Sequence, residues 1–234
     1  MTDLSAFPVT KRWPAKHPDR LQLYSLPTPN GAKVSIMLEE IGVPYEPDRV
    51  DFDKKDQTSA EFLSLNPHGK IPAIIDPNGP DGQALPLFES GAILQYLAEK
   101  TGKLLPADGV RRWETIQWVY FQMAFIGPMF GQVGYFKKFA GKDIADQRPL
   151  EYYAARSKRL LALMDARLNG REWMMGDQYT IADVSMFGWV RNLIGHYEAH
   201  DLVEYDTFRH VQAWMKRGLA RPAVQRGLTI PAKV

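Results

Sequence analysis

The amino-acid sequence predicts two successive folds, a small α/β domain and then an all-α domain. Over roughly the first hundred residues, short strand-like segments alternate with helical ones, and the last two strands form a hairpin around the turn Asp76–Gly79. Beyond a linker at residues 102–110, apolar side chains recur at helical spacing and no convincing strand follows. The expected fold class is therefore a mixed four-stranded sheet with helices on it, followed by a helical bundle.

The first domain is expected to span residues 21–101, after an arm at residues 1–20 that shows no period and is given no fold. Alternating apolar residues predict strands, helical spacing predicts helices, and glycine or proline marks where elements end. In order, the predicted elements are a strand at Leu21–Leu26, a helix at Val34–Ile41, a strand at Tyr45–Asp51, a helical turn at Ala60–Leu65, strands at Ile71–Ile75 and Leu85–Phe88, and a helix at 90–100.

The second domain is expected to span residues 111–234 and to contain only helices. Its strongest local signal is Thr180-Ile-Ala-Asp183, because a threonine followed three residues later by an acid is a variant of the capping box that starts helices. The predicted helices lie at Arg111–Phe130, with an extension past Gly134 left open, at Pro149–Leu168, at Val184–Val190 and at His210–Gly218, and the turn Arg221-Pro222 closes the bundle.

The composition excludes several classes of function. The chain has 234 residues, of which 45% are hydrophobic, so it is long enough to bury a large core. Its 29 basic and 27 acidic residues are dispersed along the sequence, which argues against nucleic acid as the main partner. The opening segment lacks the pattern of a signal peptide, and nowhere is there an apolar run of about 18 residues, so we expect a soluble, cytoplasmic protein with no membrane partner.

The chain contains no cysteine. This excludes structural disulfides, metal sites built on thiolates, a Cys-x-x-Cys redox pair and a cysteine nucleophile. Any thiol chemistry must therefore use the sulfur of a ligand. His196 and His200 have the spacing of two metal ligands on one helix, but no third ligand is evident, so we expect a surface pair and no metal.

Two dipeptides predict a binding site for a peptide with an amino-acid end. Pro72 cannot donate to a sheet ladder, so the backbone around Ile71 is left to pair with the backbone of a ligand. Ser90 begins a helix, and its hydroxyl and the first-turn N–H groups suit a carboxylate, while Glu89 suits an ammonium group. Glutathione has both a peptide middle and a zwitterionic amino-acid end.

The loop Thr28–Gly31 is a second candidate site, because it follows a predicted strand and precedes a predicted helix. The Thr28 hydroxyl, the Asn30 amide and the helix N–H groups are together able to lower the pKa of a bound thiol. Taken alone, such a loop is more often an ordinary turn and helix cap, so its interpretation depends on the motifs that accompany it.

Those motifs closely resemble the glutathione-site motifs of glutathione transferases: Asn66-Pro-His-Gly-Lys-Ile-Pro-Ala73 and Phe88-Glu-Ser-Gly-Ala-Ile93, together with the Thr180–Asp183 box. The resemblance covers nearly the whole chain from about Leu21, and it implies a thioredoxin-like amino-terminal domain and an α-helical carboxy-terminal domain. The segment Thr28–Glu40 resembles the Nu-class / Ure2-like group, whose members tend to be disulfide-bond reductases. The chain departs from the tyrosine- and serine-dependent classes, which leaves Tyr24 a weak catalytic candidate.

The resemblance also implies roles for individual residues. It puts Thr28 and Asn30 at the sulfur of glutathione, as the catalytic residues. It puts Ile71 against the backbone of the cysteinyl unit, with Pro72 in the cis form. The residues implied to bind glutathione are Gln57, Lys70, Ile71, Pro72, Glu89 and Ser90, although Gln57 is explained nearly as well as a solvated side chain.

The missing cysteines give the resemblance a mechanistic consequence. Reducing a disulfide consumes two thiols, so both must come from glutathione: one thiolate attacks the disulfide, and a second glutathione resolves the mixed disulfide. The family also implies such paired binding and a homodimer. Candidate residues for the second glutathione or the substrate are Tyr135, Lys137, Lys138, Tyr152 and Arg156, for which a solvated helix surface is the alternative.

Two other functions stay open at this point. The chain could conjugate glutathione to small electrophiles, in which case a thioether forms stoichiometrically. It could also be a non-catalytic protein that binds glutathione or another ligand, since a fold can persist while its site serves binding alone. The presence of Thr28, Asn30, Glu89 and Ser90 together favours an enzyme.

Overall fold

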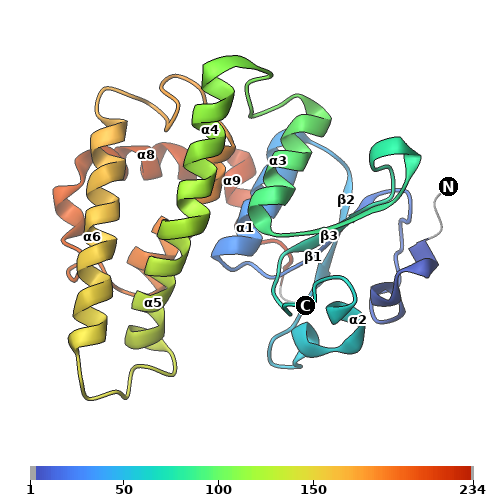
Figure 1. The fold of residues 1–234 in the computed structure, drawn as a ribbon, viewed down its shortest axis with the longest axis horizontal. Coiled ribbons are helices and arrows are strands. Elements are labelled where there is room, and N and C mark those ends of the chain that lie inside the picture. The colour runs from blue at the N-terminus through green and yellow to red at the C-terminus, as the bar shows by residue number, and fades with distance from the viewer. Residues whose placement is uncertain (1–3, 233–234) are drawn as a thin grey trace. The chain divides into compact units, whose positions relative to one another are not determined.

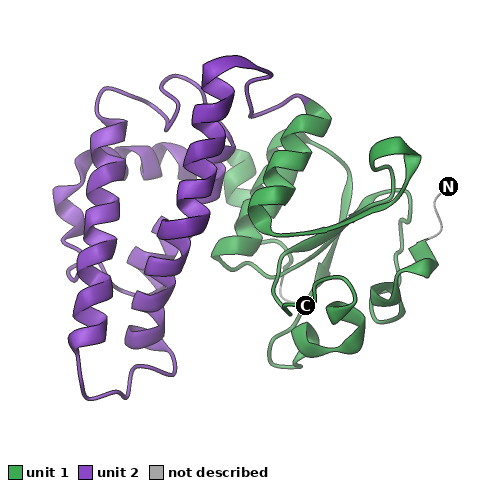
Figure 2. Cartoon of the chain, in the orientation of Figure 1, with its two compact units in different colours: residues 1–101, 222–234 green, residues 102–221 purple. Residues whose placement is uncertain are grey.

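The computed structural model describes residues 4–232, and the chain divides into two compact units (Figures 1 and 2). The first unit comprises the residues up to Thr101 together with those from Pro222 onward, and the second comprises Gly102–Arg221. The segment from Pro222 onward, which the sequence places in a helical domain of residues 111–234, thus lies in the first unit, and residues 102–110, expected as a linker, lie in the second.

The first unit is built on a mixed four-stranded sheet, as the sequence predicts (Figure 1). The strand order is β2-β1-β3-β4, in which β1 and β2 are parallel and the other neighbours are antiparallel. The strands are β1 (Leu21–Ser25), β2 (Tyr45–Arg49), β3 (Ala73–Asp76) and β4 (Leu85–Phe88), and the helices between and after them are α1 (Pro29–Ile41), α2 (Ala60–Leu63) and α3 (Ser90–Thr101).

Helix α1 begins at Pro29, five positions before the predicted start at Val34. The reason is local: the ring of Pro29 fixes a helical φ at the first position, and the Thr28 hydroxyl accepts a hydrogen bond from Gly31 N at 3.2 Å. The loop that the sequence predicts at Thr28–Gly31 is therefore the capped first turn of a helix.

The carboxy-terminal helix α9 (Pro222–Gly227) packs on α1 of the first unit. Ser35 Oγ donates to the carbonyl oxygen of Gly227 at 2.6 Å, and a Cβ atom added at Gly227 would lie 2.6 Å from the backbone of Ile36. Only glycine allows the two helix backbones to come this close, so α9 packs on α1 because residue 227 is a glycine. The sequence predicts a turn at Arg221-Pro222 that closes the helical bundle, and this prediction is wrong, because nothing local to residues 222–227 indicates a partner so distant in the sequence.

The amino-terminal arm also folds onto the first unit. It forms two 3₁₀ turns, η1 (Leu4–Ala6) and η2 (Pro8–Lys11), and the Trp13 ring then packs edge-on against Tyr24 and Phe62. The Glu46 carboxylate accepts hydrogen bonds from the backbone N–H groups of Lys16 and His17 at 3.0 and 2.8 Å. The arm therefore covers one face of β1 and β2.

Among the buried polar atoms beneath the arm, the Tyr24 hydroxyl oxygen and one carboxyl oxygen of Asp48 have no hydrogen-bond partner within residues 4–232. The two residues are opposite each other in the β1–β2 register. Burial and the nearby Glu46 carboxylate raise the pKa of Asp48 to about 7, against a smaller opposing effect of Lys16. The ionised form of Asp48 is thus destabilised by its surroundings.

We expect Asp48→Asn to stabilise the protein, and to do so increasingly as pH rises. The folded-state pKa of Asp48 lies above its unfolded value, so ionisation of Asp48 lowers the free energy of unfolding of wild type as pH rises from about 4 to about 7. Above about pH 7 this loss is complete. At pH 8 the variant should gain about 1–3 kcal/mol in the free energy of unfolding, and at pH 4 almost none. Urea unfolding at both pH values checks this, with the exposed Asp53→Asn as control; equal effects at both pH values would contradict it.

The longer elements of the second unit are all helices (Figure 2). A single long segment runs through α4 (Gly109–Phe121), the π-turn η5 (Gln122–Ile126) and α5 (Gly127–Lys138), so the predicted helix does extend past Gly134. Gly134 is required there because an added Cβ would lie 2.3 Å from the Tyr197 ring. The other elements are α6 (Arg148–Leu168), α7 (Ile181–Arg191), the π-turn η6 (Asn192–His196) and α8 (Arg209–Leu219).

The predicted capping box at the start of α7 is confirmed. The Thr180 hydroxyl accepts from Ala182 N at 3.3 Å, and the Asp183 carboxylate accepts from Thr180 N at 3.0 Å. Asp183 also accepts from Met174 N at 2.8 Å and from the Trp214 indole N–H at 2.9 Å, and it is fully buried. One carboxylate therefore joins α7, α8 and the loop before α7.

Candidate functional site

The sheet register brings three of the predicted site segments to one edge of the first unit. Tyr24 of β1 pairs with Ala73 of β3, and Ala73 pairs with Phe88 of β4. The carboxyl ends of β1 and β4 and the start of β3 consequently lie at the same edge. The loop carrying Thr28, the dipeptide Ile71-Pro72 and the dipeptide Glu89-Ser90 each adjoin one of these strand ends.

At the end of β1, Thr28 and Asn30 lie in the first turn of α1 and are partly exposed. The Thr28 hydroxyl oxygen accepts the hydrogen bond from Gly31 N, so its proton is directed to a different acceptor. Gly31 is needed at this turn, because a Cβ there would lie 1.9 Å from the carbonyl oxygen of Leu26. The turn presents helix N–H dipoles, a hydroxyl and an amide within three residues, which suits a thiolate.

Before β3, the peptide bond between Ile71 and Pro72 is cis, as predicted. Among residues 4–232, the backbone N–H and C=O of Ile71 make no hydrogen bond. The preceding loop is held from beneath: the buried Asn66 side chain donates to the carbonyl oxygen of Lys70 at 2.6 Å, while the Lys70 side chain is exposed. The fixed, unpaired backbone of Ile71 is able to pair with an extended peptide.

After β4, Glu89 adopts a left-handed backbone conformation with φ of 70°. A non-glycine residue in this region is strained, and such strain is commonly found at functional sites. Its carbonyl oxygen accepts from Ile93 N at 2.9 Å, which joins Glu89 to the start of α3. Ser90, the first residue of that helix, is 5% exposed, whereas Glu89 is exposed.

The structure adds Lys33, for which the sequence predicts no role beyond its place in the segment Thr28–Glu40. Its side chain is 1% exposed, and its ammonium donates to Ser90 Oγ at 3.2 Å. Burial lowers the pKa of Lys33 to about 7, while the Glu89 carboxylate acts in the opposite direction. Lys33 lies in a stretch of α1 that is buried on all sides. A lysine between the apolar residues Ala32, Val34 and Ile36 is the sequence signal that indicates a buried functional side chain.

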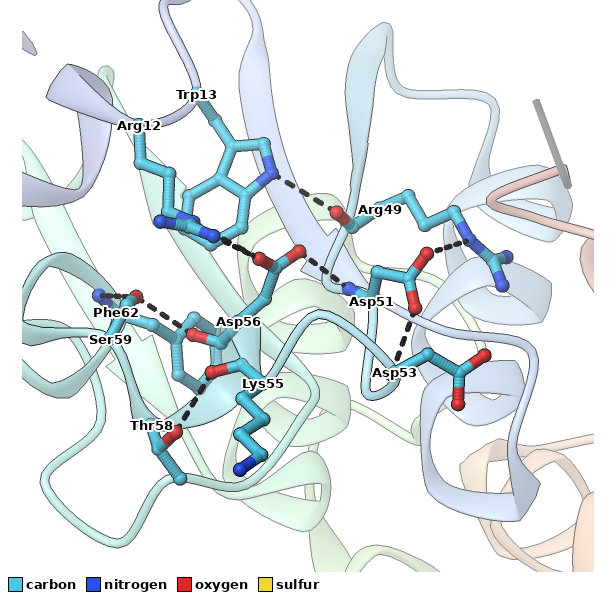
Figure 3. A network of polar contacts seen from close by, with 10 residues as sticks. All are labelled: Arg12, Trp13, Arg49, Asp51, Asp53, Lys55, Asp56, Thr58, Ser59 and Phe62. Atoms are coloured by element: carbon cyan, nitrogen blue, oxygen red, sulfur yellow. Dashed lines mark hydrogen bonds and ion pairs between the residues drawn. The ribbon is translucent and has the colours of Figure 1, made fainter.

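Gln57 lies in the segment that follows β2, and this segment is anchored by the amino-terminal arm (Figure 3). The buried Asp56 carboxylate accepts from the Arg12 guanidinium at 3.1 Å and from Asp51 N at 2.8 Å, and the Trp13 indole donates to the carbonyl oxygen of Arg49 at 3.0 Å. The Gln57 side-chain oxygen is buried and has no hydrogen-bond partner among the described residues. An unpaired buried oxygen is costly, which argues against the solvated alternative for Gln57.

The side chain of Tyr24 packs against the amino-terminal arm. Its side chain is fully buried beneath the arm, and burial together with the carboxylates of Asp48 and Glu46 holds its pKa well above the usual value for tyrosine. A phenol so placed ionises less readily than a free one and does not assist thiol ionisation. The low rank given to Tyr24 from the sequence therefore agrees with its position.

The candidates for a second glutathione fall into two groups within the second unit. Tyr135 joins Tyr152 through a chain of ring contacts that passes by Phe136 and Tyr153, and Arg156 donates to the Tyr152 hydroxyl at 2.9 Å. Lys138 instead pairs with Glu198 at 2.8 Å, and its neighbour Lys137 is partly exposed. Arg156 also lines a recess of about 270 Å³ with Phe121, Phe125, Met129, Arg159, Leu160 and Leu163.

One of the two histidines at the spacing of metal ligands, His200, pairs with acidic side chains. His200 pairs with Asp201 and Asp206 at 3.0 and 3.2 Å. In the part of the chain that the structure describes, no group of three or more histidine or acidic side chains could hold a metal ion. Over the same residues, no helix has the length and apolar character that crossing a membrane requires.

Comparison with known proteins identifies the family. Residues 19–99 match the amino-terminal domain of glutathione S-transferases, and residues 132–222 match the carboxy-terminal domain. The disulfide-bond oxidoreductase YfcG of Escherichia coli is 39% identical over 209 residues, which cover 89% of this chain and 94% of that protein. The chain belongs to the glutathione transferase family. The two family domains account for the mixed sheet of the first unit and the helices of the second.

Two solved structures of glutathione transferases are more similar still. One from Burkholderia graminis, solved with two glutathione molecules bound per subunit, is 66% identical, has a TM-score of 0.98, and is matched over 100% of this chain and 98% of that one. One from Pseudomonas putida, solved with one glutathione disulfide bound per subunit, is 63% identical with a TM-score of 0.96 over 98% of this chain and 100% of that one. These are the reduced and oxidised forms of one ligand.

Proposed function

We propose that this glutathione transferase is a glutathione-dependent disulfide reductase that uses two glutathione molecules per active site. The observation that carries the proposal is the sheet edge at which Thr28, Ile71 and Ser90 adjoin neighbouring strand ends in a chain with no cysteine. The ligands of the Burkholderia and Pseudomonas proteins and the name of the Escherichia coli relative support it.

The first glutathione follows this edge. Its cysteinyl backbone pairs with Ile71, beside Lys70 and the unpaired oxygen of Gln57. Its γ-glutamyl carboxylate lies at the Ser90 hydroxyl and the first-turn N–H groups of α3, and its ammonium lies near Glu89. Its sulfur then reaches the turn that contains Thr28 and Asn30. The residues proposed to contact this glutathione are Thr28, Asn30, Gln57, Lys70, Ile71, Pro72, Glu89 and Ser90.

Each turnover consumes two thiols. The thiolate of the first glutathione attacks one sulfur of the substrate disulfide, forms a mixed disulfide and releases one substrate thiolate, which takes a proton from solvent. The thiolate of the second glutathione attacks the glutathione sulfur of the mixed disulfide, so glutathione disulfide forms and the second substrate thiol leaves. The protein stabilises thiolates but is neither oxidised nor reduced, because it has no cysteine.

We also propose that the second glutathione is bound by the group formed by Tyr135, Tyr152 and Arg156, since Arg156 offers a cation beside aromatic rings. Lys137 and Lys138 are weaker candidates because Lys138 is paired with Glu198. The homodimer stays a prediction; the exposed side chains of Trp113, Tyr120 and Phe125 favour it, and sedimentation equilibrium would test it.

The test of the reaction is glutathione-dependent reduction of 2-hydroxyethyl disulfide, followed as NADPH consumption through added glutathione reductase. We expect turnover in which one glutathione disulfide forms per disulfide reduced. A parallel assay with an aryl halide measures thioether formation. Thioether formation without disulfide reduction would overturn the reductase in favour of conjugation, and glutathione binding with neither product would favour a binding protein.

A further inference from the structure

The amino-terminal arm is joined to the segment beside the proposed site through Arg12 (Figure 3). The Arg12 guanidinium donates from Nε to Asp56 Oδ1 at 3.1 Å, and it also donates from Nη2 to the same oxygen. The Asp56 side chain is 7% exposed, and its other oxygen accepts from Asp51 N at 2.8 Å. Burial removes the hydration of a carboxylate, so its charge needs such partners. Arg12 therefore compensates the buried charge at the centre of the segment 51–59.

Asp56 fixes the backbone of the segment that carries Gln57. Its N–H donates to the carbonyl oxygen of Asp51 at 3.1 Å, and its own carbonyl oxygen accepts from Ser59 N at 3.1 Å and from Ser59 Oγ at 2.8 Å. Asp56 is thus bonded to both ends of the segment 51–59, through its main chain as well as its side chain. Gln57 is the next residue, so its position follows that of Asp56.

Gln57 in turn lies against the loop that precedes Ile71. Gly69 has a φ of 64°, and a Cβ atom added there would lie 2.9 Å from the carbonyl oxygen of Gln57. The two backbones come this close only because residue 69 is a glycine. The Gln57 side-chain oxygen is buried without a hydrogen-bond partner among residues 4–232, which leaves it able to accept from a ligand N–H. A change in the position of Gln57 would therefore be felt by a ligand paired with Ile71.

The arm is also held by contacts other than those of Arg12. Leu4 and Val9 of the arm are buried in one apolar cluster with Ile71, and Trp13 packs against the same cluster. These contacts keep the arm in place when the Arg12 guanidinium is removed. Loss of the guanidinium should consequently loosen the segment 51–59 without unfolding the first unit.

We propose that Arg12 is a positioning residue for the glutathione site: it holds Asp56, and through Asp56 it sets the place of Gln57 beside the ligand backbone. This role rests on the glutathione site proposed above. Arg12 touches neither the ligand nor the reacting sulfur atoms, so its loss should weaken binding and leave the thiolate chemistry unchanged. Because coupling between two parts of a protein is reciprocal, a bound ligand should in turn hold the arm more firmly.

The first test is a double-mutant cycle of Arg12→Met and Gln57→Ala, measured by calorimetry as affinity for S-methylglutathione. We expect Arg12→Met to weaken binding by about five- to twentyfold in wild type but by less than about twofold in Gln57→Ala, since residues that act as one unit are not additive. In disulfide reduction, Arg12→Met should raise KM for glutathione and leave kcat within about twofold of wild type. The matched control is Arg20→Met, an exposed arginine just before β1, which should bind as wild type does.

The second test uses wild type alone, so it decides even where Arg12→Met does not fold. Hydrogen exchange is compared with and without S-methylglutathione in the peptide of residues 8–16, where the N–H groups of Arg12 and Trp13 both donate to the carbonyl oxygen of Val9. We expect saturating ligand to slow exchange in this peptide by about threefold or more, although it makes no contact with the ligand. The turn at residues 77–84, at the other end of β3 and β4, should exchange at the same rate with and without ligand.

Two results would overturn the role of Arg12. One is an equal loss of affinity from Arg12→Met in wild type and in Gln57→Ala, or no loss in either, and the other is unchanged exchange at residues 8–16 when the ligand is bound. Failure of wild type to bind S-methylglutathione at all would overturn the glutathione site itself, and the role of Arg12 with it.

Discussion

Replacing Asp183 by alanine is expected to lower the free energy of unfolding by about 3–5 kcal/mol. The carboxylate accepts hydrogen bonds from Thr180 N, Met174 N and the Trp214 indole, and all of these donors are enclosed in the second unit. Alanine would remove the helix cap and leave the three donors without partners in a dry environment, which costs more than the cap alone. The α7 residues around it are almost all buried, so water cannot easily replace the carboxylate.

Urea unfolding at pH 7.5, followed by circular dichroism and by tryptophan fluorescence, measures this effect. Burial raises the pKa of Asp183 to about 6, so the carboxylate is ionised at that pH and able to accept every one of its hydrogen bonds. Asp177→Ala is the matched control, because Asp177 is 83% exposed and pairs with Arg111 at the surface, where such a pair contributes little. A loss below about 1 kcal/mol in Asp183→Ala would contradict the role assigned to the carboxylate.

Asn30→Ala and Thr28→Val are expected to lower kcat/KM for 2-hydroxyethyl disulfide by about 10- to 100-fold each, in the range found for removal of one donor to a reacting anion. Both side chains occupy the first turn of α1, where the proposed thiolate is stabilised by their donors. Without either donor the pKa of the bound thiol should rise, so the pH profile of turnover should shift to higher pH. Affinity for S-methylglutathione should change little.

The control for Asn30→Ala is Asn169→Ala, an exposed asparagine that follows α6, and the control for Thr28→Val is the exposed Thr207→Val. Thr28→Val also removes a helix cap, so its stability is measured alongside its activity. Unchanged kcat/KM and an unchanged pH profile in Asn30→Ala would show that the sulfur is bound elsewhere.

The strand pattern and the capping box were predictable because each depends on residues close together in the sequence. Alternation of apolar side chains sets which face of a strand is buried, and it located β1 and β4 within one residue. Thr180 and Asp183 are three residues apart, so their reciprocal hydrogen bonds follow from the helix itself. By contrast, α1 begins earlier than predicted, because Thr28 caps the helix and Pro29 fixes a helical φ at its first position. The sequence of this segment is also typical of a turn, which is why the helix start was missed.

The site was predictable only as a set of residue types. The motifs around Ile71 and Ser90 indicated glutathione as the ligand, and the order of the strands then brought their segments to one edge of the sheet. The arm covers Tyr24 through the packing of the Trp13 ring, and Arg12 holds the loop before Gln57 by pairing with Asp56, 44 positions away. Both contacts depend on packing between separate segments, which no local pattern encodes.

The sequence alone determined the order of the elements, the family and the absence of a protein thiol, because periodicity, motif spacing and composition are local or additive properties. Only the tertiary structure decided that α9 belongs with α1 and that Lys33 lies buried against Ser90. The hydration lost by a side chain depends on every segment that folds over it, and for Lys33 the contact that matters joins residues 57 positions apart.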